Sequence, residues 1–332
     1  EWQVRHGCMV GWKYLLASRP DLTPELLREA LPTLLHGLQD SDDDVRAAAA
    51  EALVPVTDAL NAGGADVVGP IRAVLWDILL DLQELSASTS SVMRLLARLN
   101  AESSPEQLQT LTEYVPRLWL FVRHTLRPVR LSVLNCLTAI LGETAGGDGW
   151  LAPILERTMS HLFSSLVLEA DEDILAATGE AWGAAAGRAG GSAELEAAVG
   201  WEAPARWASL AATPPGARFD ARLVARPLGG TDGPARESKR RKLQVEDTAG
   251  ERSAAPPLGD QAGTRARVAA GEALGLLAAA LGRSAPAGGG ESGGGPVAAP
   301  CLRLLQSRSA AARQVAGVCL EAWWQRRRSG GE

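Results

Sequence analysis

Residues 31–53, LPTLLHGLQDSDDDVRAAAAEAL, predict two consecutive helices joined by a short acidic turn. On the second helix the apolar side chains recur at intervals that place them on one helical face. They are Val45, Ala49, Ala52, Leu53, Val56 and Leu60. Two helices that share one apolar face cannot bury it alone, so neighbouring pairs must stack against each other.

A Val-Arg dipeptide recurs at the start of predicted helices. It occurs at residues 4–5, 45–46 and 129–130, which are 41 and then 84 residues apart. Since 84 is twice 42, the spacing indicates a repeat within the range of about 40 to 47 residues typical of HEAT and armadillo repeats. The sequence therefore predicts an all-α fold, an α-solenoid of HEAT-type helix pairs with a disordered insertion.

Helical spacing of apolar residues also predicts the remaining helices. The expected ranges are Asp66–Leu85 with Ser88–Leu99, a helix ending near Thr125 with Val129–Leu141, Trp150–Leu168 with Asp173–Arg188, a weaker helix at Ala193–Leu210, then Arg265–Leu281 and Ser309–Gln325.

Composition shifts divide the chain into five parts. Residues 1–212 are expected to form a HEAT-repeat solenoid of about five repeats. Residues 213–262 are rich in Pro, Gly and charges and lack aliphatic periodicity, which predicts a disordered insertion. Residues 263–285 should continue the solenoid as a helix, 286–300 form a Gly/Pro-rich linker, and 301–328 form the last helical repeat.

The charge balance and the known catalytic motifs argue against several function classes. With 33 Lys and Arg against 39 Asp and Glu, the net charge of −6 disfavours a broad nucleic-acid-binding face. The sequence has no phosphate loop, zinc-protease motif or serine nucleophile elbow, and its cysteines form no CxxC pair. No apolar run approaches the length of a membrane span. We expect a soluble, intracellular, non-enzymatic segment of a longer protein, with reduced core thiols, no metal and no cofactor of its own.

The acidic turn is the candidate partner-contact loop. It contains Asp40, Asp42, Asp43 and Asp44. Aspartates at this position can cap the following helix, and a contact of the type Asp40 to Arg46 could join adjacent repeats. The same turn lies on the edge by which solenoids bind their ligands. The alternative interpretation is therefore an additional contact between the turn and a basic partner.

A short basic run in the predicted insertion is the candidate nuclear-import signal. It consists of Lys239, Arg240, Arg241 and Lys242. Import receptors bind such runs in extended chains, although a solvated run of charges is an equally good interpretation.

Three strings in the first half of the chain resemble the HEAT-repeat region of the TATA-binding-protein-associated factor family. They are EWQVRHG at residues 1–7, GLQD followed by DDDVRA at 37–47, and LWD with LSAST at 75–89. The resemblance is specific over about residues 1–168 and continues at Arg265-Ala266-Arg267.

The resemblance implies a division of labour. In that family a Swi/Snf-type ATPase removes TATA-binding protein from promoter DNA, and the solenoid holds TATA-binding protein through the loops that join its helices. The motor, which uses ATP and magnesium and contacts DNA, lies C-terminal to the repeats and is absent from this segment. The implied partner is TATA-binding protein, with promoter DNA reached only indirectly, and the implied location is the nucleus.

Two alternatives remain open at this point. A generic HEAT-repeat scaffold, of the nuclear transport receptor or phosphatase-scaffold type, would have the same architecture and bind different proteins. Direct binding of DNA is disfavoured by the net charge and by the lack of a basic helical stripe.

Overall fold

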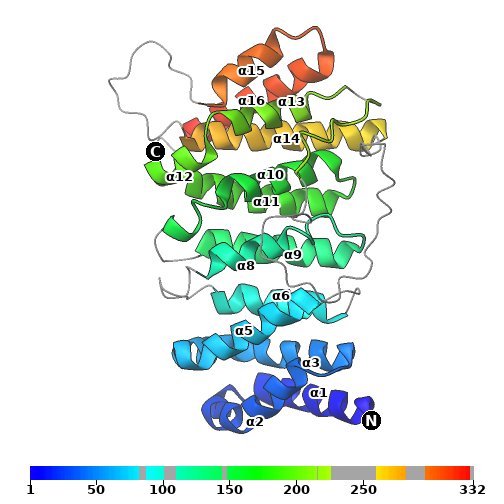
Figure 1. Cartoon of the computed structure of the whole chain (residues 1–332), viewed down its shortest axis with the longest axis vertical. Helices are drawn as coiled ribbons and strands as arrows, with labels where there is room; N and C mark the ends of the chain where they lie inside the picture. The colour runs from blue at the N-terminus through cyan, green and yellow to red at the C-terminus, as the bar shows by residue number, and fades with distance from the viewer. Residues whose placement is uncertain are drawn as a thin grey trace, which may run out of the picture. The chain divides into compact units, whose positions relative to one another are not determined.

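The computed structural model describes residues 1–81, 87–100, 110–143, 148–214, 216–225, 259–281 and 296–329, and the regular structure in these ranges is helical (Figure 1). Two compact units divide the chain. Unit 1 comprises Glu1–Ile154 and Ala176–Arg188, and unit 2 comprises Leu155–Leu175 and Ala189–Glu332. The helix α11 (Glu172–Ala189) begins in unit 2 and has most of its length in unit 1.

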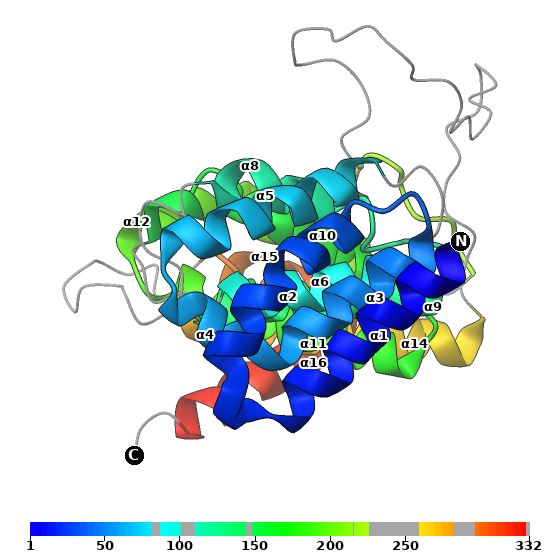
Figure 2. The same ribbon diagram turned by 90° about the horizontal axis from the view of Figure 1, so that it is seen from below.

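Unit 1 is a stack of antiparallel helix pairs in two layers. Its helices are α1 (Trp2–Ser18), α2 (Thr23–Leu38), α3 (Asp43–Leu53), α4 (Thr57–Ala62), α5 (Ala65–Asp81), α6 (Ala87–Asn100), α8 (Leu111–Leu118) and α9 (Arg127–Glu143). α1, α3, α6 and α9 pack in series, and α2, α5 and α8 pair with α3, α6 and α9. Figure 2 shows α5 and α8 in one layer and α1, α3 and α9 in the other. The predicted α-solenoid of HEAT-type pairs is confirmed.

The apolar stripe of the opening repeat forms the core of unit 1 in the predicted way. Leu34, Leu38, Val45, Ala49 and Leu53 are all fully buried. Gly37 allows α2 to approach its neighbours, since a methyl group there would lie 2.6 Å from Met9 Sδ and 3.1 Å from Ala49 Cβ.

The predicted helix through Leu60 is interrupted. α3 ends at Leu53, a 3-10 turn spans Val54–Val56, and α4 follows. Pro55 causes the break because it has no N–H to continue the helical hydrogen bonds. Val56 and Leu60 remain buried, so the stripe persists across the bend.

Unit 2 contains α10 (Leu155–Leu168), α12 (Ala193–Val199), α13 (Glu202–Ala211), α14 (Asp260–Leu281), α15 (Ala298–Leu305) and α16 (Ala310–Ser329). α14 packs against α10 and α16, and α15 packs against α16. The single weaker helix expected at Ala193–Leu210 is two helices. Gly200 separates them with a φ of +66°, a backbone conformation that glycine adopts without the strain of a side chain.

Two helices begin a few residues earlier than predicted, one inside the expected insertion and one inside the expected linker. α14 starts at Asp260 and not at Arg265, so it begins inside the insertion expected at 213–262. Its first turn, Asp-Gln-Ala-Gly, carries no large aliphatic side chain that periodicity could detect. α15 starts at Ala298, inside the linker expected at 286–300. The last helix extends to Ser329 and not only to Gln325.

The start of the predicted insertion also packs within unit 2. Residues 216–225 form no helix, yet Phe219 is buried and the backbone N–H of Ala225 donates to Ser164 Oγ at 2.9 Å. The expectation of disorder is therefore wrong for this part. Residues 226–258 lie outside the described residues, and so does the candidate import run.

α14 and α16 cross at a close contact formed by Gly271 and Gly275. A methyl group at Gly271 would lie 3.0 Å from the carbonyl oxygen of Val315, and one at Gly275 would lie 2.4 Å from that of Cys319. These two glycines let the helix backbones approach closely.

Candidate partner-binding surface

The four aspartates of the acidic turn have different environments. Asp40, Asp42 and Asp43 are partly buried, whereas Asp44 is exposed. Asp40 forms a bidentate ion pair with Arg5 of the preceding repeat, with Nε–Oδ2 at 2.6 Å and Nη2–Oδ1 at 2.9 Å. The hydrogen bond from Arg5 is the main reason why the pKa of Asp40 falls from 3.8 to about 2. Asp40 therefore joins the first two repeats.

Asp42 and Asp43 also have structural roles. Asp42 is the N-cap of α3, and its side chain accepts hydrogen bonds from the backbone N–H groups of Asp44 and Val45. Asp43 pairs with Arg46 at 2.9 Å and accepts from the N–H of Ser88 at 3.3 Å, at the start of α6. These contacts match the structural interpretation of the turn and leave Asp44 as its exposed carboxylate.

In two of the three Val-Arg pairs, at residues 45–46 and 129–130, the arginine holds the preceding turn. The Arg46 Nη1 donates to the carbonyl oxygen of Asp40 at 2.7 Å. Arg130 does the same at the start of α9, where Nη1 donates to the carbonyl oxygens of His124 and Thr125. Arg313 in α16 repeats the arrangement with Ser307 and Arg308. The recurrence of the dipeptide was visible in the sequence, but the contact of Arg46 and Arg130 with turn carbonyls was not predicted, and Arg5 of the first pair binds the Asp40 carboxylate instead.

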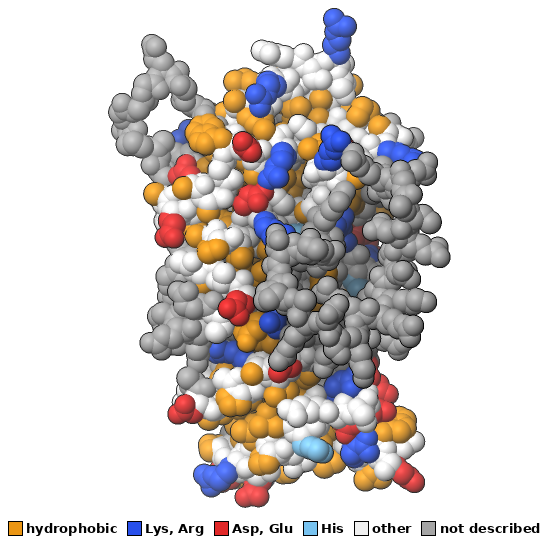
Figure 3. Space-filling model, viewed as in Figure 1, with side chains coloured by type: hydrophobic (Ala, Val, Ile, Leu, Met, Phe, Trp, Pro, Cys, Tyr) orange, Lys and Arg blue, Asp and Glu red, His pale blue; other side chains and the backbone are white. Residues whose placement is uncertain are grey.

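A second polar contact crosses three repeats of unit 1. Lys13 of α1 donates to Glu51 of α3 with Nζ–Oε2 at 2.6 Å, and Ser91 of α6 donates to the other oxygen of Glu51 at 3.2 Å. The hydrogen bond from Lys13 is the main cause that lowers the pKa of Glu51. On the face that Figure 3 shows, the described acidic and basic side chains over the helices at the bottom are interspersed. The ion pairs of Asp40 with Arg5 and of Glu51 with Lys13 therefore join repeats of unit 1.

A cavity of about 450 Å³, here called the Asp77 pocket, adjoins the acidic turn. It is lined by Leu38, Gln39, Asp40, Arg46, Val74, Asp77 and Ile78. Asp40 is engaged with Arg5, while Asp77 on α5 is exposed. Aliphatic walls beside an exposed carboxylate suit a lysine or arginine side chain, whose apolar stem is buried while the charged end remains paired. This pocket could not be predicted from the sequence, because its walls come from two repeats.

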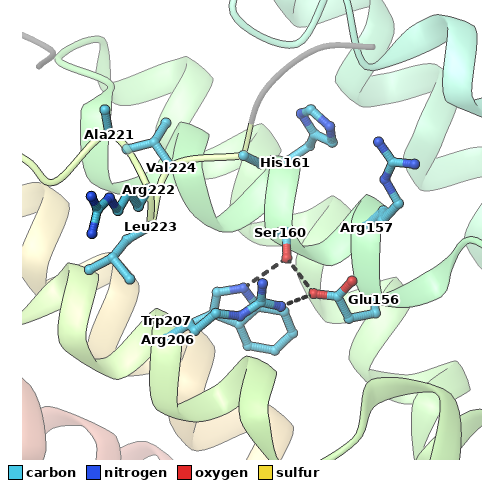
Figure 4. Close-up of a pocket in the computed structure, with 11 residues that line it drawn as sticks. Glu156, Arg157, Ser160, His161, Arg206, Trp207, Ala221, Arg222, Leu223 and Val224 are labelled. Carbon is cyan, nitrogen blue, oxygen red and sulfur yellow. Dashed lines mark hydrogen bonds and ion pairs between the residues drawn. The ribbon is translucent and has the colours of Figure 1, made fainter. Parts of the chain in front are cut away.

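A larger cavity of about 590 Å³ lies in unit 2, between α10, α13 and the segment that ends at Ala225 (Figure 4). It is lined by Glu156, Arg157, Ser160, His161, Arg206, Trp207, Ala221, Arg222, Leu223, Val224 and Ala225. Arg206 forms an ion pair with Glu156. Ser160 accepts from Trp207 Nε1 at 3.1 Å and donates to Glu156 at 3.1 Å. These bonds fix α13 against α10.

No group of His, Cys, Asp and Glu residues with the geometry of a metal site occurs among the described residues. Of the helices in the described ranges, none is both long and apolar enough to cross a bilayer.

Two protein families match parts of the chain. Residues 30–60, which span α2 to α4, match the HEAT repeat. Residues 202–330, which span α13 to α16, match a domain of unknown function, DUF3535. The HEAT match thus falls on the repeat that contains the acidic turn.

The curated relatives are named as TATA-binding protein-associated factors. Factor 172 of Homo sapiens is 42% identical over 186 residues, which are 55% of this chain and 10% of that protein. BTAF1 of Arabidopsis thaliana is 30% identical over 393 residues, which are 98% of this chain and 19% of that protein. The chain thus spans between a tenth and a fifth of these relatives. Among solved structures, a designed armadillo repeat protein in complex with the peptide (KR)4 covers 88% of this chain and 99% of its own, at 15% identity and a TM-score of 0.43.

Proposed function

Because this chain is homologous to the HEAT-repeat region of the TATA-binding-protein-associated factors, we propose that it is a non-catalytic scaffold that binds TATA-binding protein. It would act within an ATP-dependent regulator that removes TATA-binding protein from promoter DNA. The alignment with the Arabidopsis factor over 98% of the chain carries this proposal. ATP hydrolysis, with its magnesium ion, and contact with DNA belong in this proposal to a motor outside the segment.

The binding surface that the geometry supports best combines Asp44 with the Asp77 pocket. Asp44 is exposed in the first turn of α3, and Asp77 is an exposed carboxylate beside aliphatic walls. A protein that binds DNA is typically basic on part of its surface, and opposite charge accelerates encounter and fixes orientation. Asp40, Asp42 and Asp43 would support this surface through their contacts with Arg5, the N-terminus of α3 and Arg46.

Measurement of binding to immobilised TATA-binding protein tests the proposal. The variant Asp44→Asn with Asp77→Asn should associate more slowly and lose part of its salt dependence, while its melting temperature changes little. Glu29→Gln, an exposed acid on α2, is the matched control and should behave as wild type. If folded wild-type chain does not bind TATA-binding protein, the scaffold serves another partner, as in a transport receptor or phosphatase scaffold. If wild type binds and the double variant binds equally well, the contact lies elsewhere.

We propose that the protein acts in the nucleus, a location that fits relatives named as TATA-binding protein-associated factors. The run Lys239 to Lys242 is the candidate import signal. A reporter that carries residues 228–262 should accumulate in the nucleus, and substitution of all four basic residues by Ala should reduce that accumulation. Unchanged import would leave the run as a solvated group of charges.

A further inference from the structure

Two buried cysteines face each other between the last two helices of unit 2. Cys301 on α15 and Cys319 on α16 are 3% and 1% exposed, and their sulfur atoms lie 3.0 Å apart. They are 18 residues apart in the sequence. A disulfide bond is about 2.0 Å long, so the sulfurs need to approach by only about 1 Å.

The surrounding helices fix both thiols in place. The backbone N–H of Cys301 donates to the carbonyl oxygen of Val297 at 3.1 Å, in the first turn of α15. On α16 the backbone at Cys319 is in close contact with α14, where Gly275 leaves no room for a methyl group. Because neither backbone can move freely, the sulfur atoms should stay close together.

The contact makes the two thiols unequal. The hydrogen bond from the Cys319 thiol lowers the pKa of Cys301, against the opposing effect of burial. The same hydrogen bond, together with burial, raises the pKa of Cys319. Cys301 therefore forms a thiolate more readily, and the thiolate is the nucleophile in cysteine chemistry.

We propose that Cys301 and Cys319 form a redox modification site, at which a hydroperoxide converts the two thiols into an intrachain disulfide that joins α15 to α16. The Cys301 thiolate attacks the peroxide, the O–O bond breaks, and an alcohol or water leaves with the released proton. The sulfur of Cys319 then attacks the resulting sulfenic acid, the S–O bond breaks, and water leaves. Two thiols and one hydroperoxide thus yield one disulfide, one alcohol or water, and one further water.

The other two cysteines lack this arrangement. Cys136 is fully buried on α9, and burial raises its pKa to about 12, so it should resist oxidation. Cys8 on α1 is exposed and can react only with another molecule or with oxidant. In a reducing compartment the pair should be a dithiol, and its disulfide should form transiently under peroxide.

The test uses the full 332-residue chain with Cys8→Ser, which removes cross-linking between molecules. The reduced protein is treated with hydrogen peroxide, blocked with N-ethylmaleimide and digested for mass spectrometry. We expect a peptide pair linked through Cys301 and Cys319, two fewer alkylated thiols, a higher melting temperature and full reversal by dithiothreitol. The rise in melting temperature follows because a cross-link restricts the unfolded chain.

Three variants in this background assign the roles. Cys136→Ala should form the link at the wild-type rate. Cys319→Ala should stop at a sulfenic acid on Cys301 that dimedone traps, and Cys301→Ala should yield much less dimedone adduct. Circular dichroism verifies that each variant is folded.

Some results would overturn the proposal. One is a folded, peroxide-treated chain in which both thiols stay reduced or become sulfinic acids without a link. Equal trapping at Cys319 in the Cys301→Ala variant would overturn the assignment of Cys301 as the attacking thiol.

Discussion

The ion pair between Arg5 and Asp40 should set how firmly α1 is held on α3, and Asp40→Asn removes its charge while keeping the size of the side chain. The pKa of Asp40 falls from 3.8 to about 2, and each pKa unit corresponds to about 1.4 kcal/mol, which gives an upper limit of about 2.5 kcal/mol. The side chain of Arg5 is 41% exposed, so screening by water reduces this to about 1 kcal/mol.

Hydrogen exchange of α1 measures this loss directly, because end repeats of a solenoid open without unfolding the rest. About 1 kcal/mol should make the amides of α1 exchange about fivefold faster in Asp40→Asn, with little change in unit 2. The same acceleration in Arg5→Gln, and no further effect in the double variant, would show that the two residues act as a pair.

The pH dependence gives a second check. A carboxyl group with a lowered pKa in the folded state stabilises the fold above its unfolded pKa, and this contribution is lost as the pH falls through the folded value. The window for Asp40 thus lies between about pH 4 and pH 2, and the difference between wild type and Asp40→Asn should fall to about half by pH 3. A difference that stays constant down to pH 3, or additive effects of the two substitutions, would refute this reasoning.

Three further substitutions test individual contacts. Gly275→Ala should destabilise unit 2 by about 1–3 kcal/mol through overpacking against Cys319, whereas Gly317→Ala, with open space around it, should be neutral or stabilising by up to about 1 kcal/mol, as urea denaturation will show. Arg130→Met should cost about 1–2 kcal/mol because two turn carbonyls lose a charged donor, while Arg28→Met on the exposed face of α2 should change the melting temperature little. Ser160→Ala should cost about 1–2 kcal/mol and alter the fluorescence of Trp207, which loses its acceptor, and Ser209→Ala, at an exposed serine, should do neither.

The helix pairs could be predicted because a helix buried on one face has apolar residues that recur at helical spacing in the sequence. The stripe from Val45 to Leu60 is buried as expected, even where Pro55 interrupts the helix. Short elements leave too few residues for a period. This is why the start of α15, eight residues long, was assigned to a linker, and why the packing of Phe219 was not expected.

The partners of the charged residues could be predicted only where they are close in sequence. Capping by Asp42 follows from its position before α3. The carboxylate of Asp40, for which Arg46 was the expected type of partner, instead pairs with Arg5, 35 residues away, while Arg46 holds the carbonyl oxygen. The pairing of Asp40 with Arg5 cannot be predicted from local spacing, because the two side chains meet only when the repeats stack. Whether the turn contacts a partner stays a prediction.

The arginine clamp holds the backbone of a turn. Arg46, Arg130 and Arg313 bind backbone carbonyl oxygens, which every residue type supplies, so the clamp places no demand on the side chains of the turn. The three clamped turns differ accordingly: one is rich in aspartate, one carries His124 and Thr125, and one carries Ser307 and Arg308. Mutation can therefore replace the outward side chains of one turn while the backbone of the turn keeps its conformation. A repeat protein of this kind can thus acquire a new binding specificity while its helices stay as they are.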